Sequence, residues 1–106
     1  MYFSFSYFSA AMQKDEALKI LRDHKQDLVR RYSLRKVGIF GSVANNTASN
    51  ESDIDIVVEM EPDLFLSVQL KEELEQLFGS KVDLIRYWNR MNHYLRQRID
   101  KEALYV

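Results

Sequence analysis

Two short motifs in this chain carry side chains that could take part in chemistry, and ten residues separate them. Gly41 and Ser42 directly follow one apolar run, while Asp53 and Asp55 begin a second one. Glycine lets backbone N–H groups approach an anion closely, and a helix that begins there adds partial positive charge. Two carboxylates one residue apart can converge on a divalent cation. The two motifs together predict one site that holds a triphosphate and a metal ion.

The second apolar run is expected to form a strand over Ile54–Glu59, and its register favours this site. Side chains of a strand alternate between its two faces. Ile54 and Ile56 would point into the core, so Asp53 and Asp55 would share the opposite face. If the Gly-Ser motif is left aside, an equally good interpretation is that the two acids are solvated residues at a strand end.

Asp83 is a third acid, and it stands within another short apolar run. An acid is almost never fully buried unless it is paired. If the strand that contains Asp83 lies beside the previous one, its carboxylate joins the same face. It could then complete a metal shell or accept a proton from an attacking hydroxyl. The alternative is an edge-strand acid that pairs with Lys81 or Arg86.

Hydrophobic periodicity predicts the elements that would position these residues. The expected helices span residues 13–32, about 63–78 and about 90–103, with a brief helical turn at 42–45. The expected strands span residues 36–41, 54–59 and 81–86. Pro62 and Gly79 are expected to bound the middle helix, and Asn89 is expected to cap the last one. The order is helix, strand, turn, strand, helix, strand, helix.

Composition places the chain in the class of ordinary globular domains. Its 106 residues suit one domain, with 46% hydrophobic and 29% charged residues. The net charge of −1 gives no support for a duplex nucleic-acid binder. The absence of cysteine excludes disulfides and thiolate–metal sites and is compatible with a reducing cytoplasm. No apolar run reaches about 18 residues, so we expect no membrane-spanning helix.

Residues 1–11 differ from the rest, because aromatic residues alternate with serine and no lysine or arginine is present. A secretory signal would need a basic start and a longer aliphatic core. A short strand is one interpretation, and a poorly structured tail is the preferred one. Met12 is followed at once by polar residues suited to a helix start, so we take 12–106 as the single domain and Met12 as its functional beginning.

The motifs together resemble the minimal nucleotidyltransferase (MNT) domain of the DNA polymerase β superfamily. The resemblance runs from Met12 onward and rests on Gly41-Ser42, the ten-residue spacing, Asp53-Ile54-Asp55 and the acidic strand at Asp83. It implies an α+β fold with a short mixed β-sheet and helices packed mainly on one face. Small stand-alone domains of this kind resemble the MntA antitoxins of HEPN–MNT toxin–antitoxin pairs.

The resemblance implies an Mg²⁺-dependent transfer of AMP from ATP to a tyrosine of a HEPN RNase toxin, which silences that toxin. Gly41 and Ser42 would hold the triphosphate. Mg²⁺ would be bound by three acids, Asp53, Asp55 and Asp83. Asp83 would lie nearest the incoming hydroxyl. Many relatives carry arginine three residues after the serine, and often glycine next, where this chain has Asn45-Asn46. That difference removes a cation that could lie near phosphate.

The expected partners are therefore ATP and a HEPN-family toxin bound in a hetero-oligomer, in the cytoplasm, without membrane or direct nucleic-acid contact. The alternative is a non-catalytic antitoxin that neutralises its toxin by binding alone. A nucleotidyltransferase for a small molecule ranks last, because so short a chain leaves little room for a substrate domain.

Two further groups of residues have several interpretations. His24 and His93 lie on expected helices without metal-ligand spacing, so exposed helical histidines are the preferred interpretation. A second group combines aromatic and arginine side chains: Tyr87, Trp88, Tyr94, Arg86, Arg90, Arg96 and Arg98. It could form an adenine-stacking shelf, a partner-docking surface, or a core aromatic beside a solvated basic helix face.

Overall fold

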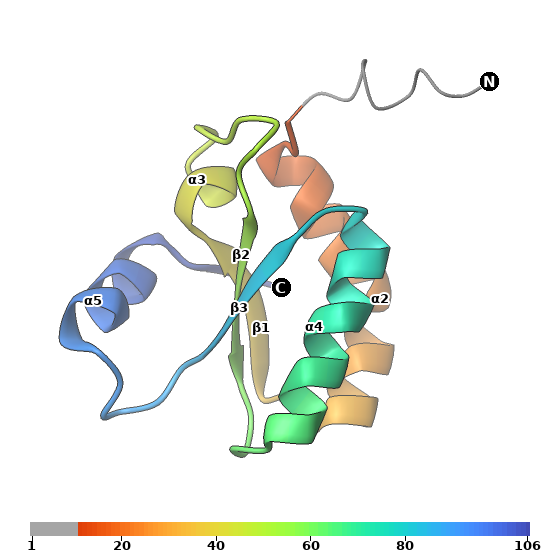
Figure 1. The fold of residues 1–106 in the computed structure, drawn as a ribbon, viewed down its shortest axis with the longest axis vertical. Coiled ribbons are helices and arrows are strands. Elements are labelled where there is room, and N and C mark those ends of the chain that lie inside the picture. The colour runs from red at the N-terminus through yellow and green to blue at the C-terminus, as the bar shows by residue number, and fades with distance from the viewer. Residues whose placement is uncertain (1–10) are drawn as a thin grey trace.

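The computed structural model describes residues 11–106, so all of the expected N-terminal tail except Ala11 lies outside the described residues. Within this range the chain forms four helices and four strands (Figure 1). The helices are α2 (Lys14–Tyr32), α3 (Gly41–Ala44), α4 (Leu64–Phe78) and α5 (His93–Glu102). The strands are β1 (Lys36–Phe40), β2 (Ile54–Glu59), β3 (Val82–Arg86) and β4 (Leu104–Tyr105).

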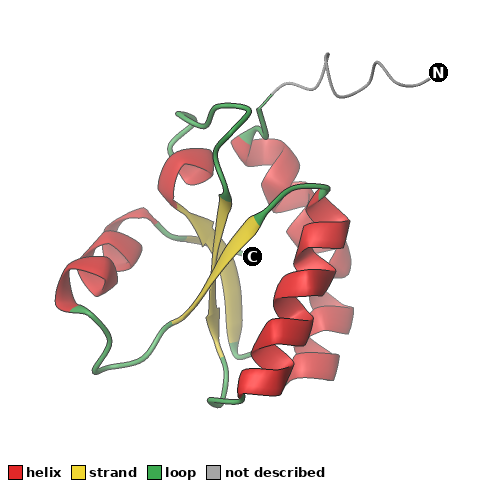
Figure 2. Ribbon diagram, viewed as in Figure 1, coloured by secondary structure: helices red, strands yellow, loops and turns green. Residues whose placement is uncertain are grey.

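The strands form one mixed sheet in the order β3-β2-β1-β4 (Figure 2). β1 is antiparallel to both β2 and β4, and β2 is parallel to β3. A parallel pair needs a crossover connection, which α4 supplies between β2 and β3. The predicted α+β class with a short mixed sheet is confirmed. β4 was not predicted, because two residues are too few for a periodic pattern.

The main core lies between the sheet and the helices α2 and α4, which cover one face of it (Figure 1). Ile54, Ile56 and Val58 of β2 are buried on this face, as their alternation predicts. From the two helices, the buried residues in this core are Ala17, Leu21, Leu28, Tyr32, Leu70, Leu74 and Phe78. The register of β2 is thereby fixed, because a shift by one residue would expose its isoleucines.

A smaller cluster lies on the opposite face of the sheet, where α5 packs. Ile99 of α5 is fully buried there, against Phe40 of β1 and Val57 of β2. The two long helices thus share one face, as predicted, and α5 covers part of the other (Figure 1). This contact brings the C-terminal helix over the end of β1.

The boundary of α5 differs from the prediction. The helix begins at His93 and not at residue 90, and Asn92 caps it by accepting from the Leu95 backbone N–H at 3.0 Å. Asn89 and Asn92 are both good capping residues. The carbonyl of Asn89 instead accepts from the Arg96 guanidinium at 2.8 Å, which keeps the preceding loop folded back on the helix.

Glu73 joins α4 to α2 through hydrogen bonds from Arg31, to both of its carboxylate oxygens, and from Tyr32, and its replacement tests this packing. Its carboxylate accepts from Arg31 at 2.9 Å and from the Tyr32 hydroxyl at 2.7 Å. The Arg31 hydrogen bond is the main reason why the pKa of Glu73 is lowered. We expect Glu73→Gln to lower the free energy of unfolding by about 1 kcal/mol at pH 7.

The pH dependence of that loss follows from the lowered pKa. A lowered carboxyl pKa stabilises the folded state above the ordinary glutamate pKa, and the gain disappears as the pH falls through the folded value. Urea unfolding at pH 7 and at about pH 3 should therefore show a difference between variant and parent that shrinks at the acidic pH. Glu72→Gln, at an exposed neighbouring position, is the control. A loss of equal size at both pH values would contradict the assignment.

Candidate active site

Gly41 is the first residue of α3 and forms the turn that directly follows β1, and the structure shows why this position is glycine. Its φ is 72°, in the left-handed region that side chains rarely adopt. A β-carbon at Gly41 would collide with Oδ2 of Asp55 and would lie 3.4 Å from a guanidinium nitrogen of Arg98. The Asp55 carboxylate thus packs directly on the turn, so the two motifs predicted to form one site are in contact.

The three acids lie at one end of the sheet. Asp53 directly precedes β2, and Asp55 is opposite Phe40 of β1 in the antiparallel register. Asp83 of β3 is in register with Asp55 on the parallel side. The strand that contains Asp83 therefore lies beside β2, which is the arrangement required for Asp83 to join Asp55. Asp53 and Asp83 are exposed and Asp55 is half-buried. None of the ion pairs found in residues 11–106 involves Asp83.

Asp55 is in an electrostatic environment that suits a cation. Burial, followed by the nearby charge of Asp83, raises the pKa of its carboxyl to about 6, although Arg98 opposes both effects. Among residues 11–106, no three acidic or histidine side chains are gathered closely enough to hold a metal ion by themselves. Mg²⁺ is commonly held by one or two carboxylates, with substrate phosphates as further ligands. These residues therefore fit a divalent cation that is bound together with a phosphorylated ligand.

The raised pKa of Asp55 makes a prediction for the metal-free protein. A carboxyl whose folded pKa is raised stabilises the fold fully below its ordinary pKa, and this contribution is lost as the pH rises through about 6. We expect Asp55→Asn to raise the free energy of unfolding at pH 8 by about 1 kcal/mol. This figure is smaller than the full pKa shift would give, because the carboxyl is partly solvated.

Thermal unfolding without divalent ions at pH 8 and at about pH 4 would measure this gain, which should vanish at the lower pH. Glu51→Gln, at an exposed position just before the acids, is the control and should leave the stability unchanged at both pH values. Parent and Asp55→Asn proteins of equal stability at pH 8 would show that Asp55 carries no such penalty.

Two residues of α5 reach the same turn. The sequence indicated Arg98 only as a member of the aromatic and arginine group, and it indicated no role for Glu102. Glu102 accepts a hydrogen bond from the Gly41 backbone N–H at 3.2 Å. Arg98 lies one helical turn earlier, with its guanidinium 3.6 Å from the same Glu102 oxygen. The i, i+4 spacing of Arg98 and Glu102 was visible in the sequence. Their place beside Gly41 was not, because it depends on how α5 packs.

The segment that follows Gly41 is fixed mainly by backbone hydrogen bonds. The Ser42 carbonyl accepts from the Thr47 N–H at 2.8 Å, and the Gly41 carbonyl accepts from the Asn45 N–H at 3.0 Å. Asn46 has a φ of 59°, a conformation that asparagine tolerates better than most residues. Asn45 is exposed on this turn and brings no positive charge to it.

The acids stand on open surface. A cavity of about 460 Å³ lies on the other side of the loop after α3, between the start of α2 and the end of α4, and it is lined by Met12, Val43, Ser52 and Phe78, among others. Neither the turn residues Gly41 and Ser42 nor the three acids line it. A ligand at the acids would therefore bind on a surface that large molecules can reach.

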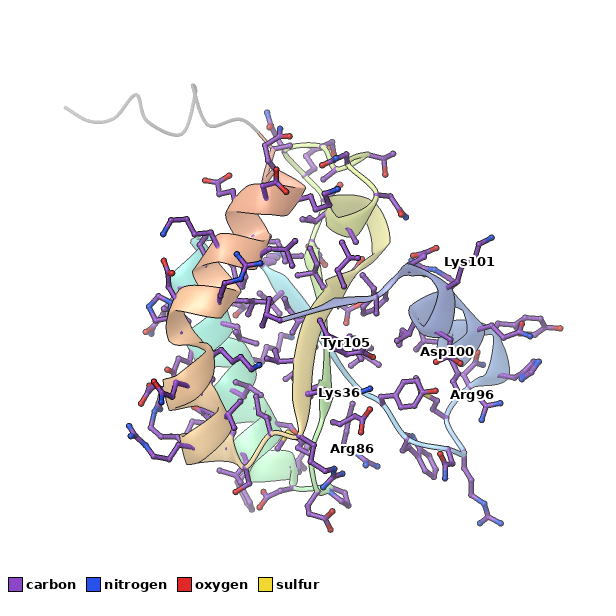
Figure 3. All side chains as sticks on the ribbon, turned by 180° about the vertical axis from the view of Figure 1, so that it is seen from behind. Lys36, Arg86, Arg96, Asp100, Lys101 and Tyr105 are labelled. Atoms are coloured by element: carbon purple, nitrogen blue, oxygen red, sulfur yellow. The ribbon has the colours of Figure 1, made fainter. Side chains whose placement is uncertain are left out.

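Arg86 and Trp88 of the aromatic and arginine group lie away from the acids, unlike Arg98, which reaches the Gly41 turn. Arg86, which pairs with Val58 of β2, follows Asp83 by three positions on β3. Three positions along a strand separate the two residues by roughly 10 Å. Its guanidinium lies 5.5 Å from the ring centre of Trp88, which is 44% exposed. Figure 3 shows Arg86 on the sheet and Arg96 on α5 at this end of the molecule. Trp88 is thus a surface residue remote from Asp83, and His24 and His93 are exposed on helices, as predicted.

Residues 13–106 match the family described as polymerase beta nucleotidyltransferase. The protein adenylyltransferase MntA of Thermococcus cleftensis is 34% identical over 99 residues, which cover 92% of this chain and 99% of that protein. A solved structure described as a candidate minimal nucleotidyltransferase is 32% identical with a TM-score of 0.71, over 88% of this chain and 95% of that one. A toxin–antitoxin crystal structure with AMP-PNP is 25% identical with a TM-score of 0.65, over 78% of this chain and 69% of that one.

Proposed function

Because the chain belongs to the polymerase beta nucleotidyltransferase family, we propose that it transfers AMP from ATP to a protein toxin, as the antitoxin of a toxin–antitoxin pair. The prediction of a nucleotidyltransferase is confirmed at the level of the family. The finer proposal is that Mg²⁺ is the metal, that a tyrosine of a HEPN-type toxin is the acceptor, and that the pair acts in the cytoplasm. The observation that carries the proposed AMP transfer is the contact between the Gly41 turn and Asp55, with Asp83 in register beside Asp55.

In this proposal each residue of the site has one task. The backbone at Gly41 and Ser42 binds the triphosphate, and Asp53 and Asp55 hold Mg²⁺. The metal ion, when bound, neutralises charge on the phosphates and on the pyrophosphate that leaves. Asp83 accepts the proton of the attacking hydroxyl. The hydroxyl oxygen bonds to the α-phosphorus in line as the bond between that phosphorus and the pyrophosphate oxygen breaks.

A macromolecular acceptor agrees with the exposure of the site. Asp53 and Asp83 are exposed, and the cavity between α2 and α4 described above does not enclose them. A tyrosine on the surface of another protein could therefore approach the nucleotide directly. No helix within residues 11–106 has the length and apolar character needed to cross a membrane.

The experiment is to incubate the purified chain with a HEPN-type toxin, ATP and Mg²⁺, and to measure the mass of the intact toxin. The proposal expects a gain of one or more AMP units, located on tyrosine by peptide fragmentation, and no gain when EDTA removes the metal. RNase activity of the toxin should fall as AMP is added. A toxin that is neutralised without any change of mass would instead favour the antitoxin that acts by binding alone.

A further inference from the structure

The turn predicted to hold the triphosphate has no positively charged side chain of its own. No lysine or arginine occurs between Gly41 and Ser52, and Asn45 is an uncharged residue on the exposed side of the turn. Phosphate groups are bound most strongly by charge-assisted hydrogen bonds, usually from arginine or lysine. A cation for the triphosphate must therefore come from another part of the fold.

Arg98 is placed to supply that cation. Its neighbour Ile99 is fully buried against the sheet, which fixes this turn of α5 beside the end of β1. The guanidinium lies 5.7 Å from the ring centre of Phe40, and one of its nitrogens lies 3.4 Å from the position that a Gly41 β-carbon would take. The side chain is 54% exposed, so a ligand can reach it. Arginine offers several N–H donors in one plane, which suits phosphate oxygens.

Glu102 shows where an anion would bind between these groups. One oxygen, Oε1, is 3.2 Å from the Gly41 backbone nitrogen and 3.6 Å from the Arg98 guanidinium. A single anionic oxygen is therefore held by a backbone N–H at the turn and by a cation from α5. An oxygen of a triphosphate has the same charge and the same need for donors, so it can replace the carboxylate oxygen at this position.

We propose that Arg98 binds the triphosphate in place of the cation missing at Asn45, and that Glu102 holds this position until the nucleotide displaces it. The inference rests on the proposed nucleotide site at Gly41 and Asp55. Arg98 releases Glu102 and turns its N–H groups to a phosphate oxygen. The Gly41 N–H exchanges its carboxylate acceptor for the same ligand.

The first test measures binding and not transfer. The ligand is the Mg²⁺ complex of α,β-methylene-ATP, which cannot lose pyrophosphate, and the method is isothermal titration calorimetry. We expect Arg98→Gln to weaken binding by about 10- to 100-fold, the effect of losing a charge-assisted contact. Arg96→Gln removes the same charge from another side of α5, where the guanidinium contacts Asn89, and it should stay within about twofold of the parent.

The second test removes the charge of the residue that holds the position. Gln at position 102 can still accept from the Gly41 N–H, so Glu102→Gln should preserve the turn. We expect it to bind the same nucleotide several-fold more tightly, because the competing anion and its repulsion of phosphate are gone. Binding that is unchanged or weaker in this variant would overturn the role given to Glu102.

Equal affinities for the Arg98→Gln and Arg96→Gln variants would overturn the role of Arg98. If Arg98→Gln does not fold, Arg98→Lys takes its place in the experiment. Lysine keeps the charge but lacks the planar set of N–H donors, so we expect several-fold weaker nucleotide binding. Unchanged binding by Arg98→Lys would overturn the proposal. The proposed function fails separately, if the parent binds the nucleotide but never adds AMP to a toxin. A parent that binds no nucleotide would overturn both.

Discussion

Asp53→Asn is expected to lower the rate of AMP transfer by about 1000-fold or more while the fold and the complex with the toxin persist. Asp53 is exposed and directly precedes β2, so its side chain contributes little to the core. Its proposed task is to hold the metal ion, and asparagine removes the negative charge that the task needs. The rate is measured as the initial increase of AMP-modified toxin by intact-mass spectrometry.

A matched control separates this effect from a general loss of negative charge. Glu51→Gln removes one charge from an exposed position two residues earlier, and the transfer rate should stay within about twofold. Size-exclusion chromatography with the toxin checks that both variants still form the complex. Full transfer by Asp53→Asn would exclude the metal role of Asp53. Rescue of growth by an Asp53→Asn protein that adds no AMP would favour neutralisation by binding alone.

Gly41→Ala is expected to cause the second large loss, of about 100-fold or more in transfer rate, because a methyl group there meets the Asp55 carboxylate. Either Asp55 or the turn must move, and the proposed triphosphate and metal sites then lose their alignment. The left-handed conformation at Gly41 adds a cost of about 1–2 kcal/mol for any residue with a β-carbon. Transfer rate and thermal stability are measured on the same preparation.

Gly79→Ala provides the control, since it shares the strain but not the collision. Gly79 ends α4 with a φ of 65°, and a β-carbon there has no neighbour within 4 Å. This variant should lose only the stability that corresponds to the left-handed strain, less than Gly41→Ala loses, and it should keep its transfer rate at temperatures where it is folded. If both variants lose activity to the same extent, the loss follows from stability and not from the contact with Asp55.

Local patterns in the sequence predicted much of the site. The alternation of Ile54 and Ile56 with Asp53 and Asp55 sufficed to orient the two acids, because burying one face of a strand exposes the other. The position of Asp83 depended on a pairing that could only be proposed from the sequence. The parallel register of β2 and β3 now places it beside Asp55, although its role in catalysis stays a prediction.

Other features required the tertiary structure. The start of α5 could not be decided from sequence, since Asn89 and Asn92 are comparable caps and the choice depends on how the preceding loop contacts Arg96. The two residues of β4 form a strand only because β1 offers a free edge to pair with. Neither feature has a signal in the composition or spacing of the residues involved.

The sequence by itself determined the helices, the three longer strands, the family and the acidic pair, because each depends on neighbours along the chain. Only the tertiary structure decided that Gly41 contacts Asp55 and that Arg98 and Glu102 lie at the same turn. The Glu102 carboxylate and the Gly41 N–H are 61 positions apart, and their contact requires α5 to be fixed on the sheet by Ile99. A contact of that kind is set by the packing of whole elements, which no local pattern encodes.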